Sequence, residues 1–400
     1  MMADSQWISR SNKHFMNTYG RYPVTMVSGK GCTLTDVEGR EYLDFLAGIA
    51  VCSLGHCHPA ITEAICAQAG KLVHVSNLYY TIPQTELAEL LVANSFADRV
   101  FLANSGAEAN EAAIKLARKA AGPGRFEVIS LAGSFHGRTL ATVAATAQEK
   151  FHQGFEPLPQ GFRYAPFGDI EALAEMITPQ TCAVLCEPLQ GEGGVRPLAK
   201  EYLQAIRALC DERDLLLIFD EIQVGMGRTG SLFAYEQLGV TPDIMTLAKA
   251  LGNGLPIGAM LATDKVAAAF VPGSHASTFG GNPVACAAAV VATRIMLTPG
   301  FLAEVKAKGD YLNEKLTALA EKYPQIAYPA RGLGLIQGLP LTEQFIEQGG
   351  AIVTKLFERG VLLNFAGNKV LRCLPPLVVS RAEIDRMITV LDEVFAGLTL

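Results

Sequence analysis

Short apolar runs that alternate with helical patterns constrain the fold of this chain more than any other feature. The runs lie at residues 100–102, 127–131, 183–186 and 215–219. Between them, small and apolar residues recur every three or four positions, which is the spacing of a buried helix face. Continuously apolar strands separated by helices form parallel sheets that are covered on both faces. The sequence therefore predicts an α/β fold with a mostly parallel sheet.

The two ends of the chain have a different pattern. Residues 20–45 alternate in the manner of β-strands with turns between them, and a long helical stretch starts near residue 284. Shorter mixed elements follow that stretch. We therefore expect residues 51–284 to form a large domain and residues 285–400 to form a smaller one, which the N-terminal segment 1–50 joins.

Composition narrows the class of protein. The 400 residues carry 33 Lys and Arg against 39 Asp and Glu, a net charge of −6 without a basic run, which argues against a nucleic-acid-binding surface. Apolar stretches are broken by Gly, Pro or charge, so we expect no membrane span. The first ten residues lack the apolar core of a signal peptide. The nine cysteines indicate buried free thiols, and we therefore expect a cytoplasmic location.

One lysine stands where a strand-like run ends. Residues 243–248 are mostly apolar, and a glycine-containing turn follows Lys249 at once. Burial of the charged form is costly, so the pKa of a lysine in such a place tends to fall. The neutral amine is a nucleophile toward carbonyl groups. The alternative is a lysine that extends from the strand end into solvent.

A carboxylate ends another strand-like run. Asp220 follows residues 215–219, and Glu221 and Gln223 come just after it. Ligands of α/β sheets bind outside the carboxyl ends of the strands, where Asp220 and Lys249 are both expected. Pyridoxal phosphate (PLP) requires a lysine at its aldehyde and an acid at its ring nitrogen. The pair therefore suits PLP.

The start of the alanine-rich helix is a candidate phosphate site. Free amides at a helix N-terminus and the helix dipole favour an anion, and Gly106 and Ala107 would lie there. Ser105 and Glu108 have the spacing of a capping box, so an ordinary capped helix is the alternative.

Two further segments follow predicted strands. Phe135 could stack on a cofactor ring, and Arg138 suits the binding of a carboxylate through two hydrogen bonds; a surface loop is the alternative. Glu187 and Glu192 follow the run at 183–186, where they could instead cap the next element.

Two other motifs match known patterns but are interpreted structurally. Residues 225–230 match GxGxxG, yet Asp220 and Glu221 precede them and no acid follows at the expected distance. We therefore expect a glycine-rich surface or subunit-contact loop. His56-Cys57-His58 has no second ligand cluster, so we expect a turn before a helix and no metal site.

Together these segments make the chain similar to the class III PLP-dependent aminotransferases of fold type I. The resemblance covers nearly the whole chain and includes residues 55–59, 105–111, 135–139, 187–194, 220–230, 248–254 and 277–283. It implies a large domain with a mostly parallel seven-stranded sheet and a smaller α+β C-terminal domain.

The resemblance assigns roles around the cofactor. Lys249 would bind PLP covalently and then move the proton, and Asp220 would keep the ring nitrogen protonated. Gln223 would contact the ring oxygen, and Phe135 would stack on the ring. The phosphate would be bound by Ser105, Gly106 and Ala107, and by Thr278 of a neighbouring subunit, which implies a homodimer with shared active sites.

The resemblance also assigns roles around the substrate. Arg138 would bind a substrate carboxylate, with Tyr19 and Ser277 beside the substrate. Arg372 would bind the second carboxylate of glutamate or 2-oxoglutarate, and Glu192 would pair with Arg372 when that carboxylate is absent.

Length and motifs are most similar to family members that transfer the distal amino group of N2-acetyl-L-ornithine to 2-oxoglutarate, a step of arginine biosynthesis. Ile49 stands where ornithine-specific members carry tyrosine. Ala107 replaces a threonine of many acetylornithine enzymes, so the backbone amides must suffice there. Ornithine, succinylornithine, succinyl-diaminopimelate and 4-aminobutyrate are alternative amino donors. A non-catalytic PLP-binding protein is the alternative of another class.

Overall fold

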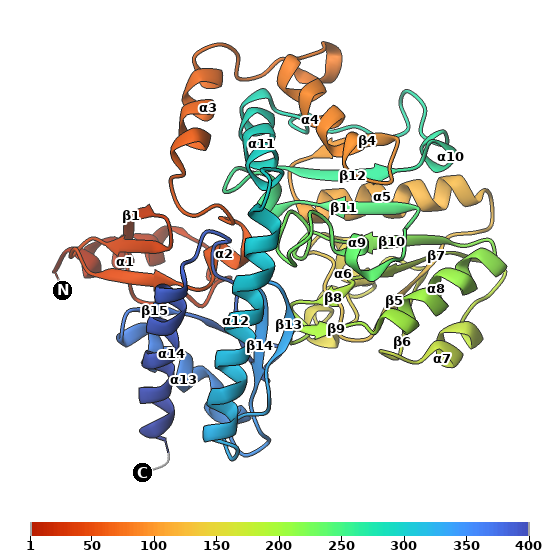
Figure 1. Cartoon of the computed structure of the whole chain (residues 1–400). Helices are drawn as coiled ribbons and strands as arrows, with labels where there is room; N and C mark the ends of the chain where they lie inside the picture. The colour runs from red at the N-terminus through yellow and green to blue at the C-terminus, as the bar shows by residue number, and fades with distance from the viewer. Residues whose placement is uncertain (1, 399–400) are drawn as a thin grey trace.

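The computed structural model describes residues 2–398 and has two lobes (Figure 1). The larger lobe is built on a central sheet from the middle of the chain. The smaller lobe combines the two ends of the chain, and helix α12 (Phe301–Lys322) runs along it.

The central sheet has seven strands in the order β4-β12-β11-β10-β7-β5-β6. Strand β12 is antiparallel to both of its neighbours, and the other pairs are parallel. The predicted α/β fold with a mostly parallel sheet is confirmed. The strands are β4 (Arg99–Ala103), β5 (Glu127–Leu131), β6 (Phe162–Ala165), β7 (Thr181–Cys186), β10 (Leu216–Asp220), β11 (Ile244–Leu247) and β12 (Gly258–Ala262).

Helices cover both faces of this sheet because alternate strand residues point to opposite sides. Helix α5 (Gly106–Ala121) packs with Val128, Leu185 and Ile218 on one face. Helix α8 (Lys200–Glu212) packs on the other face, where the neighbouring strand residues are buried. Shorter helices of this lobe are α6 (Leu140–Ala145), α7 (Ile170–Glu175), α9 (Ala234–Leu238) and α10 (Asp264–Ala267), and a two-stranded ribbon pairs β8 (Leu189–Gln190) with β9 (Arg196–Pro197).

The smaller lobe contains two four-stranded sheets. In the first, β15 (Val361–Leu362) pairs in parallel with β3 (Glu41–Asp44), so the N-terminal segment shares a sheet with the C-terminal part. Strands β1 (Met26–Lys30) and β2 (Thr33–Asp36) complete that sheet. The second sheet contains β13 (Arg331–Leu333), β14 (Ile336–Pro340), β17 (Val370–Cys373) and β16 (Asn364–Ala366), and the remaining helices of the lobe are α13 (Gly349–Glu358) and α14 (Arg381–Ala396).

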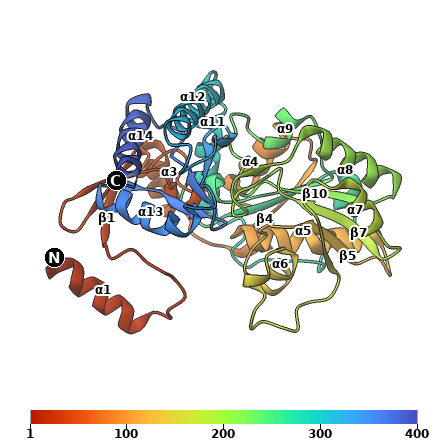
Figure 2. The same cartoon turned by 90° about the horizontal axis from the view of Figure 1, so that it is seen from below.

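Helix α11 (Pro283–Met296) begins at the predicted domain boundary and packs against α3 (Pro59–Ala69) and α4 (Ile82–Ala93). The domain limits at residues 50 and 284 stay predictions. Helix α1 (Met2–His14) stands away from the body (Figure 2). Within residues 2–398, no single helix is long and apolar enough to cross a membrane, although α11 and α12 pass that test as a pair bent by 74°.

Residues 225–230 are not the surface loop expected from their glycines, because all but Gly230 are buried. Arg228 explains the burial. Its guanidinium donates to the carbonyl of Leu335 (3.0 Å), to that of Pro375 and to the hydroxyl of Ser53 (2.9 Å). One buried side chain thus joins this loop to both the smaller lobe and the segment that precedes helix α3. Its role in subunit contacts stays a prediction.

The cysteines are free thiols, as expected, but they are not uniformly buried. Cys57 and Cys66 are exposed and Cys52 is partly exposed, whereas the other six are buried. Residues 56–58 precede helix α3, whose N-cap is His58, and no group of metal-binding side chains occurs in the described part of the chain.

Candidate active site

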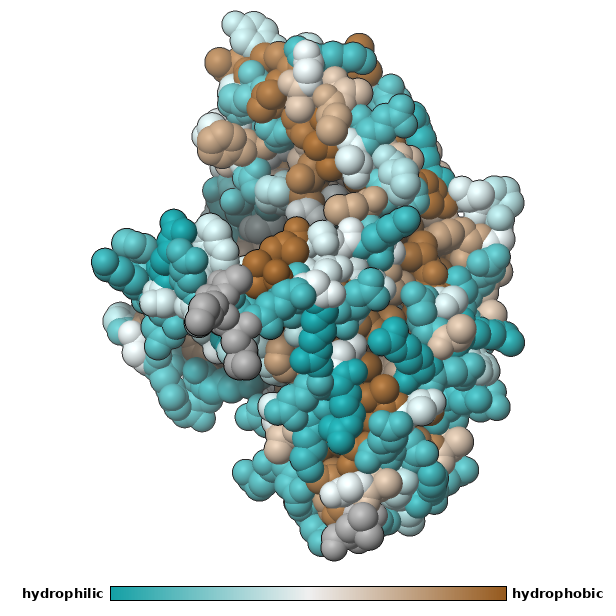
Figure 3. Space-filling view, turned by 90° about the vertical axis from the view of Figure 1, so that its left-hand side faces the viewer, coloured by the Kyte–Doolittle hydropathy of each residue, from teal (hydrophilic) through white to brown (hydrophobic). Residues whose placement is uncertain are grey.

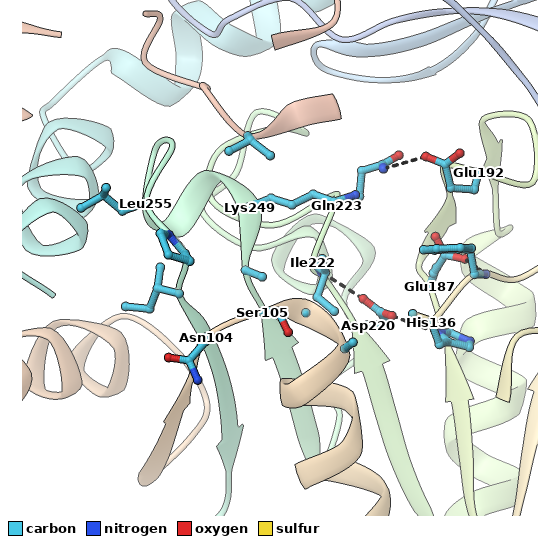
Figure 4. Close-up of a pocket in the computed structure, with 18 of the residues that line it drawn as sticks. Asn104, Ser105, His136, Glu187, Glu192, Asp220, Ile222, Gln223, Lys249 and Leu255 are labelled. Atoms are coloured by element: carbon cyan, nitrogen blue, oxygen red, sulfur yellow. Dashed lines mark hydrogen bonds and ion pairs between the residues drawn. The ribbon is translucent and has the colours of Figure 1, made fainter. Parts of the chain in front are cut away.

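A cavity of about 360 Å³ lies at the carboxyl ends of the central strands. Most of the predicted cofactor residues line it: Ser105, Gly106, Ala107, Phe135, Asp220, Gln223 and Lys249. Glu192 lines it as well, and so do His136, Glu187 and Asn104, to which the sequence analysis assigned no role. Figure 4 shows the side chains of Lys249, Gln223 and Glu192 in a row above Asp220 and His136.

Lys249 begins the single turn η3 (Lys249–Leu251) just after β11. Its φ is 46°, a left-handed conformation that costs a non-glycine residue roughly 1–2 kcal/mol. Such strain persists where the surrounding structure imposes it, often at functional sites. Burial lowers the pKa of Lys249 to about 8, although Glu192 opposes that shift. About 10% of the amines are then neutral at pH 7, against about 0.03% for an ordinary lysine.

Asp220 is the last residue of β10 and is buried. Its Oδ2 accepts hydrogen bonds from Asn110 Nδ2 and is 2.8 Å from His136 Nδ1. Its Oδ1 accepts from the backbone amide of Ile222 at 3.1 Å. Several donors thus fix this carboxylate in place, as the position of a partner for a cationic ring nitrogen requires.

The N-terminus of α5 opens into the cavity. Ser105 is the N-cap, and its hydroxyl accepts from the amide of Glu108. The Glu108 carboxylate binds the backbone and side chain of Asn104 instead of completing a capping box. The first amides of a helix have no intrahelical acceptor, so those of Gly106 and Ala107 are available to an anion. A Cβ on Gly106 would lie 2.8 Å from Ile222, so the close approach of these segments requires glycine.

Arg372 reaches the site from β17 of the smaller lobe. Its Nη1 donates to Glu192 Oε1 at 2.7 Å and to Gln223 Oε1 at 3.0 Å, and its Nε donates to Asn364 at 3.1 Å. Its Nη2 is buried without a partner in the described part of the chain. Burial raises the pKa of Glu192, but the Arg372 guanidinium outweighs it and holds that pKa below its ordinary value.

Phe135 and Glu187 form the wall beside Asp220. The Glu187 carboxylate accepts from the amides of Phe135 (3.0 Å) and Gly191 (3.2 Å), and burial raises its pKa to about 7. Arg138 is exposed, and its guanidinium lies over the rings of Phe151 (4.0 Å) and Phe135 (5.5 Å) at the edge of the site.

Besides Arg138 and Arg372, three further predicted residues do not line the cavity. Ser277 is the nearest, because its hydroxyl accepts a hydrogen bond from Asn104, which lines the cavity. Thr278 is exposed on another part of the surface beside Phe279. Tyr19 is 71% exposed and lines a hollow of the N-terminal segment with Trp7. The roles given to these three residues stay predictions.

An unusual turn precedes Val51, which lines the cavity. The four residues of α2 (Ala47–Ala50) all have φ between 50° and 64°. Left-handed turns suit glycine, but only Gly48 is glycine here, and Ile49 is β-branched. The Asp44 carboxylate stabilises the turn by accepting from the amides of Leu46 and Ala47.

Sequence reasoning missed the buried polar residues behind Asp220. These are His136, Asn110 and Thr246. His136 follows Phe135 in a motif that was already noted, and Asn110 interrupts the alanine-rich face of α5. A polar residue on an otherwise apolar helix face was the available signal, because buried polar groups are hydrogen-bonded.

The lysine with a lowered pKa, the fixed carboxylate and the helix N-terminus fit the aldehyde, ring nitrogen and phosphate of PLP. Fold and site together therefore define a PLP-dependent enzyme of fold type I. The sequence model of the Aminotransferase class-III family matches residues 15–395, and the chain belongs to that family. It is thus a PLP-dependent transaminase, which acts on amino acids and 2-oxo acids.

Individual relatives agree with this assignment. The chain is 52% identical to the acetylornithine aminotransferase of Methanocaldococcus jannaschii, covering 98% of this chain and 99% of the relative. Among solved structures, it is similar to N-acetylornithine aminotransferase from Stenotrophomonas maltophilia (TM-score 0.84, 41% identity, 98% and 99% covered). It is also similar to ornithine aminotransferase from Toxoplasma gondii (TM-score 0.94, 34% identity, 99% and 96% covered).

We predict that PLP can be fixed by borohydride on Lys249 and on no other lysine of the cofactor-free protein. The labelling rate should rise with pH through a midpoint of about 8, because the neutral amine is the nucleophile. Mass spectrometry of the labelled peptide measures this, with Lys249→Ala as the unlabelled control. Label on another lysine, or a midpoint near the ordinary value of 10.5, would contradict the prediction.

Proposed function

We propose that this enzyme transfers the distal amino group of N2-acetyl-L-ornithine to 2-oxoglutarate, giving N-acetyl-L-glutamate 5-semialdehyde and L-glutamate. The observation that carries the proposal is the identity of about half of all residues, over nearly the full length, with acetylornithine aminotransferases of several organisms. The reaction is a step of arginine biosynthesis.

Ornithine is the nearest competing substrate. The ornithine aminotransferase from Toxoplasma gondii superposes better than the N-acetylornithine enzyme from Stenotrophomonas maltophilia (TM-scores 0.94 and 0.84), yet it shares fewer residues (34% against 41%). Backbone similarity reports the fold, whereas side chains at the site decide the substrate. Identity therefore favours the acetylated substrate, as does Ile49.

In this proposal, PLP when bound would supply an electron sink for the substrate carbon that loses its proton and a carrier for the amino group. Lys249 is the base that takes this proton and returns it, and its lowered pKa suits that task near neutral pH. The Asp220 carboxylate would stabilise positive charge at the ring nitrogen. The amides of Gly106 and Ala107 would hold the phosphate, and Phe135 would pack on the ring.

One pocket must accept two unlike substrates. The reacting carbon of 2-oxoglutarate carries a carboxylate, whereas the reacting carbon of acetylornithine carries only hydrogen in that place. Arg372 would bind the carboxylate through its unpaired Nη2. When the amine substrate is present, Glu192 would keep its 2.7 Å contact with Arg372, so that the buried cation is not left unpaired.

We further propose a homodimer in which Thr278 completes the phosphate site of the partner. Its segment adjoins an exposed apolar region, because Asn77 donates to the carbonyls of Ser277 and Gly280. Figure 3 shows apolar side chains gathered at the end of the molecule where Figure 1 places α3 and the connection to α4. That connection exposes the large apolar side chains of Leu72, Val73, Leu78, Tyr79 and Tyr80. An exposed apolar patch of this kind is typical of a protein interface.

Free thiols support a cytoplasmic location. Cys57 and Cys66 are exposed and unpaired, which suits a reducing compartment.

The first prediction from this proposal concerns the amino donor. With 2-oxoglutarate as acceptor, kcat/KM for N2-acetyl-L-ornithine should exceed that for ornithine by about 100-fold, because a site that binds the acyl group discriminates against a substrate that lacks it. A panel should include succinylornithine, succinyl-diaminopimelate and 4-aminobutyrate. Faster turnover of ornithine or 4-aminobutyrate would contradict the assignment. An unchanged cofactor spectrum on addition of glutamate would instead indicate a non-catalytic protein.

The second prediction concerns the Arg372–Glu192 pair. Arg372→Ala should slow the glutamate half-reaction by about 30- to several-thousand-fold, the effect of losing roughly 2–5 kcal/mol from a buried charged contact. The acetylornithine half-reaction should change much less, and Glu192→Ala should show the reverse preference. Single-turnover absorbance measures each half-reaction, with the exposed Arg386→Ala of α14 as control. Equal losses in both half-reactions for Arg372→Ala would exclude the proposed change of partner at Arg372 between the substrate carboxylate and Glu192.

The third prediction concerns the shared site. Lys249→Ala chains and Thr278→Arg chains should each be inactive, but refolding them together should restore about a quarter of wild-type activity. Half of the dimers are then hybrids, and each hybrid has one intact site. Mass spectrometry verifies the exchange of subunits. Exchanged dimers without activity would argue against a contribution of Thr278 across the interface.

A further inference from the structure

A buried chain of hydrogen bonds ends on the carboxylate of Asp220. The Thr246 hydroxyl donates to Asn110 Oδ1 at 2.7 Å, and Asn110 Nδ2 donates to Asp220 Oδ2 at 2.8 Å. The same Nδ2 donates to the backbone carbonyl of His136 at 2.8 Å. Thr246 and Asn110 are fully buried, and Asp220 and His136 nearly so. In Figure 4, Asp220 and His136 lie side by side at the bottom of the cavity.

This arrangement determines which way the Asn110 amide faces. An amide has two N–H donors on one side and an oxygen acceptor on the other. Here both donors meet acceptors, namely the Asp220 carboxylate and the His136 carbonyl, and the oxygen meets the Thr246 hydroxyl. A flipped amide would place its oxygen against two acceptors. The two acceptors therefore fix the orientation of the amide, and the Thr246 hydroxyl holds the amide oxygen in place by donating to it.

The consequence for Asp220 is an asymmetry between its two oxygens. Oδ2 is engaged by Asn110 and lies 2.8 Å from His136 Nδ1. Oδ1 has, within residues 2–398, only the Ile222 amide at 3.1 Å as a hydrogen-bonding partner. Oδ2 is thus occupied by two partners, whereas Oδ1 keeps a free acceptor position toward the cavity that Asp220 lines.

We propose that Thr246 and Asn110 are positioning residues of the reaction: Thr246 anchors the oxygen of the Asn110 amide, and this amide fixes Asp220 so that Oδ1 alone receives the ring nitrogen. This inference rests on the proposed function of Asp220. Neither residue reaches the cavity, so both act through Asp220. The fold places them, because Thr246 of β11 is in register with Asp220 of β10 and α5 lies over both strands.

The test removes only the hydroxyl. Thr246→Val keeps the shape of the side chain but leaves the buried oxygen of the Asn110 amide without its donor, so that the amide is held less firmly. We expect about a 5- to 50-fold decrease in kcat and a comparable increase in the Kd for PLP, the effect of one disturbed hydrogen bond to a buried charge. The KM values of both substrates should stay within about twofold. Thr246→Ser restores the hydroxyl and should restore both constants.

Two further variants sharpen the result. Thr293→Val is the matched control, because Thr293 is a buried threonine of α11 that donates to the carbonyl of Ala289, away from the site. Asn110→Asp should impair PLP binding at least as strongly as Thr246→Val, because two carboxylates then face each other. In the cofactor-free protein, the downfield proton resonance of a His136–Asp220 hydrogen bond should shift in Thr246→Val and not in Thr293→Val.

The outcomes separate this inference from the proposed function. If Asp220→Asn keeps wild-type kcat, the function assigned to Asp220 is wrong. The positioning of Asp220 by Thr246 and Asn110, called the relay below, is overturned with it. If Asp220→Asn is impaired while Thr246→Val matches Thr293→Val in kcat and in the Kd for PLP, the relay alone is overturned. A change of KM without a change of kcat also overturns it. Should Thr246→Val not fold, near wild-type constants for Asn110→Asp would overturn the relay equally.

Discussion

The parallel pairing of β10 with β11 is the constraint on which the rest of the site depends. The two strands run in register, so their carboxyl ends meet at one edge of the sheet. Asp220 is the last residue of β10, and Lys249 lies two residues after the end of β11. The backbone positions of the acid and the lysine are fixed relative to each other, because backbone hydrogen bonds between the strands would have to break before either could move. The fold thereby supplies the geometry before any ligand arrives.

The smaller lobe contributes a positive charge, that of Arg372, to the active site. Arg372 enters from β17, and its cation balances Glu192 at the cavity wall. This works only if the two lobes keep their relative position, and Arg228 is one of the side chains that join them. Burial lowers the pKa of Arg228 to about 9. The fold therefore tolerates an expensive buried cation at the junction of the lobes, where carbonyl oxygens from two separate segments stabilise it.

The main chemical residues could be predicted from sequence because their signals are local. Asp220 and Lys249 each follow an apolar run, and the end of such a run is where an α/β sheet binds its ligands. The contacts of Asn110 and Thr246 could not be predicted, since they join residues 110, 136, 220 and 246 across separate elements. The burial of residues 225–230 was predicted wrongly, because glycines indicate a turn but not what packs against it. The antiparallel strand β12 has a composition that does not reveal its direction. The family resemblance added Arg372, which no local pattern singled out.

The left-handed turn at Ala47–Ala50 has a consequence for how this enzyme can be altered. The Asp44 carboxylate holds the turn from outside it, so the backbone position of residue 49 does not depend on its own side chain. Isoleucine is among the residues that resist this conformation most, yet the turn forms. Substitutions at position 49 therefore place new side chains on a backbone whose left-handed conformation is already set. Most of these variants should have less backbone strain than the natural isoleucine. Evolution, natural or directed, can change this corner of the molecule without refolding it, whereas position 44 has no such freedom.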